Sequence, residues 1–132
     1  MMHGARKRVA VTEALLNRPT KLNSLNLDMV RDLARGLEQA PPGLLILEGA
    51  GDRAFCAGGD VAAVQKQVVN GSQQLAEDFF YEEYKLDHAL ATSPNHVQVS
   101  IWNGVTMGGG VGLSLPGRFR APCIMVVVCK TT

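Results

Sequence analysis

Two glycine-rich stretches, each placed after a run of apolar residues, constrain this chain more than any other feature of its sequence. The first glycine corner, residues 54–60, reads AFCAGGD and follows the apolar run 44–47 and a turn at 49–52. The second glycine corner, residues 103–112, reads NGVTMGGGVG and follows the strand-like run 97–102. Paired glycines allow a positive φ and let another group approach the backbone closely. Each stretch therefore predicts a bare backbone corner between a strand and a helix.

Such corners leave backbone N–H groups available to an oxygen atom that arrives from outside the chain. One amide from each corner would form a two-donor hole for the oxyanion of a thioester. The alternative interpretation is that each corner is only a tight turn, which glycine pairs commonly mark. At the end of the first corner, Asp60 is suited to cap the helix that follows.

The rest of the chain alternates predicted strands with predicted helices. Apolar runs indicate strands at residues 9–16, 44–47 and 97–102. Helical spacing indicates a helix that starts from Asn26 and closes at residues 41–43, and further helices over 61–69, 73–91 and 111–115. This order predicts an α/β fold in a single domain, because a chain of 132 residues holds one domain at most.

Composition excludes several classes of function. The 13 basic and 12 acidic residues nearly cancel, so no basic face for nucleic acid is expected. No apolar run approaches the ~20 residues that cross a bilayer, and we expect no membrane partner. The 3 cysteines lack zinc-ligand spacing, which predicts no metal site and favours a reducing compartment.

One acidic residue interrupts the apolar stripe of the long helix predicted over residues 73–91. Glu83 falls among residues at helical spacing that are otherwise apolar: Leu75, Phe79, Leu86 and Leu90. A carboxylate on a core-facing stripe is costly without partners. Two interpretations remain open from the pattern: a structural salt bridge or exposed edge, and a carboxylate that lines a pocket.

Three motifs in this order resemble the crotonase (enoyl-CoA hydratase/isomerase) superfamily: residues 16–19 (LNRP), 54–60 and 106–112 (TMGGGVG). Residues 79–84 (FFYEEY), together with Gly112 where hydratases carry a glutamate, narrow the resemblance to the 3-hydroxyisobutyryl-CoA hydrolase branch. The resemblance implies an incomplete crotonase-like spiral of ββα units and an acyl-CoA substrate, with coenzyme A as part of the substrate and no separate cofactor. It also implies valine catabolism and a mitochondrial location. The sequence leaves the oligomeric state open, with a homo-oligomer as one alternative.

The resemblance assigns roles to particular residues of this chain. Gly59 and Gly109 are the expected catalytic amide donors. Glu83, Gly109, Gly58 and Asp60 are the expected substrate-binding residues.

The chain also departs from the hydrolase branch, whose catalytic glutamate and aspartate follow the second corner. No acidic residue follows Asp87 in this sequence. We therefore expect residues 1–120 to be the N-terminal part of a crotonase-like domain, truncated before that pair, and residues 121–132 to be a tail outside the family. The leading hypothesis is a thioester hydrolase of the 3-hydroxyisobutyryl-CoA type. The alternatives are an inactive CoA-binding remnant or isoform, and an enoyl-CoA hydratase/isomerase, which Gly112 disfavours.

Overall fold

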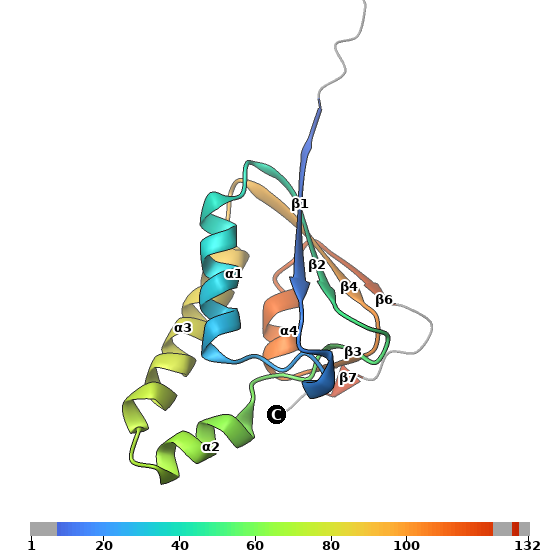
Figure 1. Ribbon diagram of the computed structural model, residues 1–132. Coiled ribbons are helices and arrows are strands. Elements are labelled where there is room, and N and C mark those ends of the chain that lie inside the picture. Colours follow the sequence, from blue (N-terminus) through green and yellow to red (C-terminus); the bar gives the residue numbers. More distant parts are fainter. Residues whose placement is uncertain (1–7, 123–127, 130–132) are drawn as a thin grey trace, which may run out of the picture.

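The strands of this protein form two parallel sheets in the computed structural model, which describes residues 8–122 and 128–129 (Figure 1). The larger sheet has the order β1-β2-β4-β6, with strands at Ala10–Leu16, Gly43–Gly49, His96–Trp102 and Phe119–Pro122. The smaller sheet has the order β3-β5-β7, with strands at Ala54–Cys56, Val105–Met107 and Val128–Cys129. All neighbouring strands pair in parallel, which confirms the predicted α/β class.

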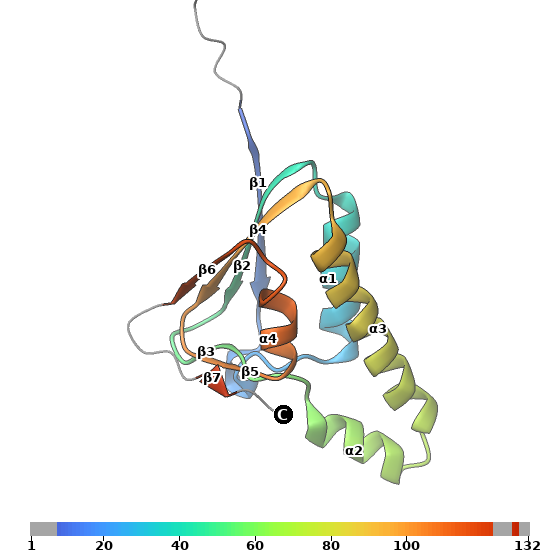
Figure 2. The same cartoon turned by 180° about the vertical axis from the view of Figure 1, so that it is seen from behind.

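The helices connect these strands. They are α1, α2, α3 and α4, at Leu27–Gln39, Val61–Val69, Gln73–Thr92 and Gly109–Ser114, with a short 3-10 helix, η1, at Pro19–Lys21. Figures 1 and 2 show α1 and α3 side by side on one side of the larger sheet, with α4 between α3 and the strands. The predicted helices are confirmed, although α4 begins at Gly109, two residues earlier than the prediction.

Two predicted helix caps are present. The Asn26 side chain accepts a hydrogen bond of 2.9 Å from the Met29 N–H at the start of α1. The Asp60 carboxylate accepts one of 3.1 Å from the Ala63 N–H at the start of α2. Each cap satisfies an amide that has no partner within its own helix.

The hydrophobic core brings together residues from the larger sheet, the helices and β3: Leu16, Leu25, Val30, Leu47, Phe55, Phe79, Leu86 and Leu113. The predicted stripe of α3 is wrong at one end, because Leu75 is 43% exposed whereas Ala76 is 5% exposed. Leu75 lies in the first turn of α3, in the part of the helix that extends away from the sheet with α2 (Figure 2). The side of this turn that bears Leu75 therefore faces solvent and not the hydrophobic core.

One sequence expectation falls mainly on residues that the structure does not describe. The predicted tail, residues 121–132, is described only at 121–122 and 128–129. Among the helices in the described residues, none has the length and hydropathy required to cross a bilayer.

Candidate active site

The two glycine corners lie next to each other because each contains a short strand and the two strands are paired. Strand β3 forms the start of the first corner, strand β5 leads to Gly108 in the second, and the two strands run parallel. Neighbouring parallel strands deliver their carboxyl ends to the same edge of a sheet, where open α/β folds bind ligands. The tertiary structure thus brings together segments that are far apart in the sequence.

The backbones of the corners are in direct contact. Gly58 has φ of 102°, and a Cβ atom there would lie 3.4 Å from the Gly109 nitrogen and 3.2 Å from the Met107 carbonyl oxygen. Gly108 has φ of 46°, a conformation that disfavours residues with a side chain. A Cβ atom on Gly110 would collide with the Cys56 carbonyl oxygen. These approaches explain why both segments are built from glycine.

The first corner leaves one amide unused between two that are engaged. The Ala57 N–H donates to the Leu22 carbonyl oxygen at 3.0 Å, and the Asp60 N–H donates to the Leu25 carbonyl oxygen at 2.8 Å. Within the described ranges, the Gly59 N–H has no backbone or side-chain acceptor. It is thus available to a ligand oxygen.

The second corner offers an amide in a comparable state. Gly109 is the first residue of α4, so its N–H has no acceptor within the helix. It also has no acceptor elsewhere in the part of the chain that the structure describes. Both amides that the sequence singled out are therefore uncommitted, and they lie on corners that touch.

A second set of interactions braces the first corner, and the sequence analysis missed most of it. Arg18 donates to Asp60 Oδ2 at 3.0 Å and to the Ser24 carbonyl oxygen at 2.7 Å. The buried Asn23 side chain donates to the carbonyl oxygens of Ala50 and Ala54, at 2.9 and 2.8 Å. The sequence signal for these contacts was the motif at residues 16–19, which contains Arg18. For Asn23 there was no such signal, because the sequence does not show which carbonyl groups its side chain meets.

Asp60 has both carboxylate oxygens engaged within the protein, one by the Ala63 N–H and the other by Arg18. Burial alone would raise the pKa of Asp60, but these two donors outweigh it and lower that pKa below its usual value. Its helix cap is confirmed. Its direct contact with substrate stays a prediction, and the carboxylate already has a structural task.

Glu83 lies in the core, at 6% exposure, and its Oε1 atom contacts the second corner. A Cβ atom on Gly109 would collide with that oxygen. Neither of the ion pairs in the described residues includes Glu83, so the salt-bridge interpretation has no support there. Burial raises the pKa of the Glu83 carboxyl.

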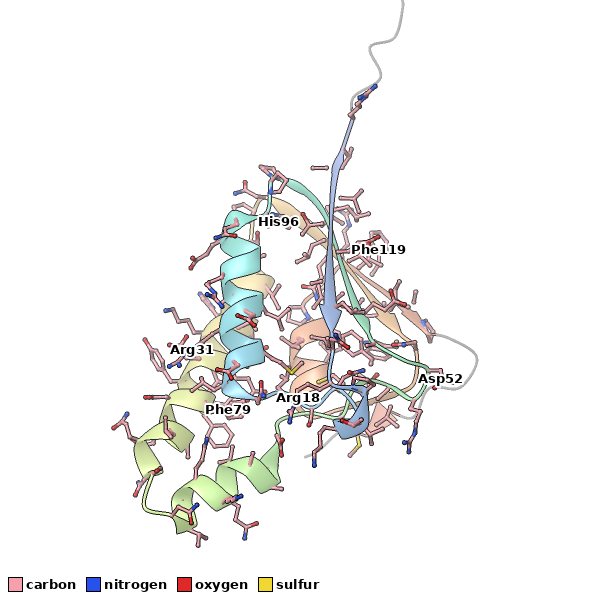
Figure 3. All side chains as sticks on the ribbon, viewed as in Figure 1. Arg18, Arg31, Asp52, Phe79, His96 and Phe119 are labelled. Carbon is pink, nitrogen blue, oxygen red and sulfur yellow. The ribbon has the colours of Figure 1, made fainter. Side chains whose placement is uncertain are left out.

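Phe79, one turn before Glu83 on α3, covers the first corner (Figure 3). Two atoms of its ring lie 3.2 Å from the place of a Cβ atom on Gly59. The face of α3 that bears Phe79 and Glu83 is therefore the wall beside both corners. The predicted ligand contacts of Gly58 and Glu83 stay predictions.

Asp87 is a further carboxyl beside the corners that the sequence analysis did not assign to the site. Its Oδ2 atom lies 2.8 Å from the place of a Cβ atom on Gly112. Burial, followed by the nearby Glu83 charge, raises the Asp87 pKa from 3.8 to about 7. The available signal was its spacing, since a residue four after Glu83 lies on the same face of a helix.

Cys56 is fully buried within the first corner, two residues before Gly58. Burial raises the pKa of its thiol to about 12. A thiolate is the nucleophilic form of cysteine, so Cys56 stays an inert packing residue at neutral pH.

An apolar cavity of about 390 Å³ lies elsewhere in the molecule, between β1, α1, β2 and α3. Leucine side chains make up much of its wall, including Leu33, Leu45 and Leu86. No residue of either glycine corner lines it. It lies beside the larger sheet, away from the two amides.

Comparison with known proteins identifies relatives of this chain. The family model described as enoyl-CoA hydratase/isomerase matches residues 11–128. A crystal structure of an enoyl-CoA hydratase from Rhodobacter sphaeroides superposes with a TM-score of 0.79 at 32% identity, covering 93% of this chain and 37% of that one.

The relatives found by sequence comparison include proteins named as hydrolases and a protein named as a ribosomal subunit. The mitochondrial 3-hydroxyisobutyryl-CoA hydrolase of Xenopus laevis is 49% identical over 109 residues, which cover 80% of this chain and 28% of that protein. A small ribosomal subunit protein of Neurospora crassa is 43% identical over 111 residues, which cover 80% of this chain and 22% of that protein. The chain therefore spans less than a third of the length of either relative.

Proposed function

Because this chain belongs to the enoyl-CoA hydratase/isomerase family, we propose that it binds acyl-CoA thioesters at the two glycine corners. The N–H groups of Gly59 and Gly109 donate to the thioester carbonyl oxygen and stabilise the negative charge that develops there. Backbone donors aimed at a developing oxyanion are each worth about 10²–10³ in rate in enzymes that use them.

The observation that carries this proposal is the contact between two corners whose amides are both uncommitted. The Gly109 nitrogen lies 3.4 Å from the Cβ position of Gly58, the residue before the other donor. Gly59 and Gly109 are both partly exposed, so a ligand can reach this pair of uncommitted N–H groups at the end of two parallel strands.

Glu83 is the side chain closest to the reacting group in this proposal. Its Oε1 atom contacts Gly109, one of the two donors. The carboxyl thus orients the acyl group beside the thioester carbonyl. Gly58 keeps the corners in contact, and Asp60 holds the first corner in place through its bonds to Ala63 and Arg18.

The reaction that we propose is thioester hydrolysis of the 3-hydroxyisobutyryl-CoA type, in which water cleaves the acyl–sulfur bond and releases a carboxylic acid and the CoA thiol. The support is the 49% identity to the Xenopus hydrolase and the glycine at position 112. The same relative supports a mitochondrial location and a place in valine breakdown.

A second candidate is binding of acyl-CoA without turnover. The similarity to a small ribosomal subunit protein supports this candidate, because that relative is named for a place in the ribosome and not for a reaction.

One experiment tests the binding site and separates the candidates. The ¹⁵N-labelled chain is titrated with isobutyryl-CoA and, in parallel, with the thioether analogue of the same carbon skeleton, which lacks the carbonyl oxygen. We expect the thioester to shift the amide resonances of Gly59 and Gly109, whereas the thioether leaves them in place. Equal responses to the two ligands would contradict the two-donor site.

Release of CoA thiol from 3-hydroxyisobutyryl-CoA, followed over the same titration, distinguishes the reactions. Carbonyl-dependent shifts with thiol release support the hydrolase, and the same shifts without release support binding alone. Hydration of an unsaturated acyl-CoA is the third readout. It is expected to be absent, because Gly112 provides no carboxyl.

A further inference from the structure

Two carboxyls on α3 face consecutive turns of α4. Glu83 and Asp87, called the acid pair below, are separated by one helical turn and share a face of α3. Glu83 Oε1 contacts Gly109, and Asp87 Oδ2 lies 2.8 Å from the Cβ position of Gly112. The acid pair is therefore aligned along the helix whose first residue is a proposed oxyanion donor.

The space beside Gly112 in α4 is filled by the Asp87 side chain, which belongs to α3. Any side chain at residue 112 would have to displace the Asp87 carboxyl, since a separation of 2.8 Å is too short for a contact of Cβ. A carboxyl thus lies next to α4 at this turn, although residue 112 itself carries none. It reaches that place from α3.

We propose that Asp87 is a positioning residue of the thioester site, which occupies the space left by Gly112 and holds a proton while Glu83 is ionised, so that the acid pair carries one negative charge. This inference rests on the proposed function for its site, but not for the behaviour of the acid pair in the free protein.

Among the described residues, neither carboxyl of the acid pair has a cationic partner. Helix α4 contains no ionisable side chain, and the buried Cys56 thiol of β3 stays neutral with its pKa raised to about 12. Lys66 of α2 and His88 beside Asp87 are both exposed to solvent. Asp87 Oδ1 is buried and has no hydrogen-bond partner among the described residues.

The charged residues of α1 lie around a different face of α3. Asp28, Arg31, Asp32 and Arg35 line a surface groove with Glu82 and Lys85, and neither member of the acid pair lines that groove. Asp32 also borders the apolar cavity beside Leu86. Burial is the largest cause of the raised pKa of both carboxyls, and the Glu83 charge is the second cause for Asp87.

The functional consequence follows from the order in which the acid pair ionises. Burial and the Glu83 charge raise the Asp87 pKa to about 7, so Asp87 is the later of the two to lose its proton. As the pH rises through that value, the site therefore gains a negative charge at Asp87. A second anion beside the donors opposes the accumulation of negative charge on the thioester oxygen.

The first test uses the ligand-free chain, so its result does not depend on the proposed function. Side-chain ¹³C resonances of Asp87 are followed against pH in the wild type, in Glu83→Gln and in the matched control Glu82→Gln. We expect a wild-type midpoint near 7, a lower midpoint in E83Q, and no change in E82Q. An Asp87 midpoint at its ordinary value, or one that ignores the E83Q change, overturns the inference.

A steric variant tests the same arrangement without altering a charge. Gly112→Ala is expected to push the Asp87 carboxyl toward solvent and lower its midpoint. The control is Gly36→Ala, which adds a methyl group to a helical glycine with nothing within 4 Å. If G112A folds and leaves the midpoint unchanged, Asp87 does not occupy the space beside Gly112, and the inference is wrong.

The second test reads the site itself. The ratio of thioester to thioether affinity is measured by calorimetry at pH 6 and pH 8 for the wild type and Asp87→Asn. We expect the ratio to fall severalfold at the higher pH in the wild type and to stay constant in D87N. A residue that only supports the fold would not produce this difference, so equal pH dependence in the two proteins contradicts the inference. Circular dichroism confirms that D87N is folded.

Discussion

The two glycine corners are held in place by different interactions. The first is held by side chains that reach it from the segment after β1, including Arg18 and the buried Asn23. The second is held by close backbone contact with β3 and faces the buried carboxyl of Glu83. The first corner is thus held by hydrogen bonds from side chains. The second corner lies beside a carboxyl, so the electrostatic potential around it depends on the ionisation of that carboxyl. Packing, polar bracing and pH should therefore affect the two regions differently.

The largest expected effect on stability comes from a side chain added where the backbones of the two corners are in contact. In Gly110→Ala, the new Cβ would collide with the Cys56 carbonyl oxygen and lie 2.8 Å from Cys56 Cβ. Overpacking against a backbone that cannot move away should lower the free energy of unfolding by about 3 kcal/mol, measured by urea denaturation.

Gly36→Ala is the matched control for that change, because it also adds a methyl group to a helical glycine but meets nothing within 4 Å. It should raise stability by about 0.5–1 kcal/mol through helix propensity. If G110A were as stable as G36A, the corners would not be in the close contact described.

The next effect concerns the polar bracing of the first corner. Asn23→Ala removes two hydrogen bonds to the carbonyl oxygens of Ala50 and Ala54, and one accepted from the Arg18 N–H at 2.9 Å. At about 1 kcal/mol for each bond, the loss in unfolding free energy should be about 2–3 kcal/mol. The exposed Asn70 serves as the control, since N70A should change stability by less than about 0.5 kcal/mol. Similar losses in N23A and N70A would show that Asn23 does not brace the corner.

The acid pair should produce a smaller effect that depends on pH. The folded-state pKa of Asp87 is raised from 3.8 to about 7, so its contribution to stability is fully present below pH 3.8 and is lost as the pH rises through 7. Asp87→Asn should therefore be about 1–2 kcal/mol more stable than the wild type at pH 8, a value already reduced for partial exposure, with the difference disappearing near pH 4.

Urea denaturation at both pH values measures this difference. Asp52→Asn, at an exposed turn (Figure 3), removes the same charge away from α3 and should show no such trend. A stability difference of equal size at pH 4 and pH 8 would argue against a raised pKa for Asp87.

The smallest effect is expected at the ion pair of the first corner. Arg18→Met removes the 3.0 Å ion pair with Asp60, in which the side chains of Arg18 and Asp60 are 24% and 15% exposed. The free energy of unfolding should fall by about 1 kcal/mol at pH 7. Because the Asp60 pKa is lowered in the folded state, this contribution is present above pH 3.8 and is lost as the pH falls below it. Thermal unfolding at pH 7 and pH 2.5 tests this sign, with the exposed Arg53→Met as control. A cost that persists at pH 2.5 would assign the effect to the other contacts of Arg18, such as its hydrogen bond to the Ser24 carbonyl oxygen, and not to the ion pair.

Much of the fold could be read from local patterns. The spacing of apolar residues located α1, α2 and α3, and the caps at Asn26 and Asp60 followed from residue type alone. Leu75 was misplaced because periodicity shows which residues share a face but not where the core ends. At the site, Glu83 was found because it interrupts an apolar stripe, whereas Asp87 gave no comparable signal.

The sequence by itself determined that this chain has two glycine corners, each between a strand and a helix, and a carboxyl among apolar residues on α3. Those features are local, since glycine conformation and helical spacing depend on neighbouring residues. Only the tertiary structure decided that β3 pairs with β5, that Asn23 reaches Ala54, and that Asp87 enters the space beside Gly112. The physical reason is that each contact joins distant segments, whose approach depends on the packing of the whole sheet and its helices.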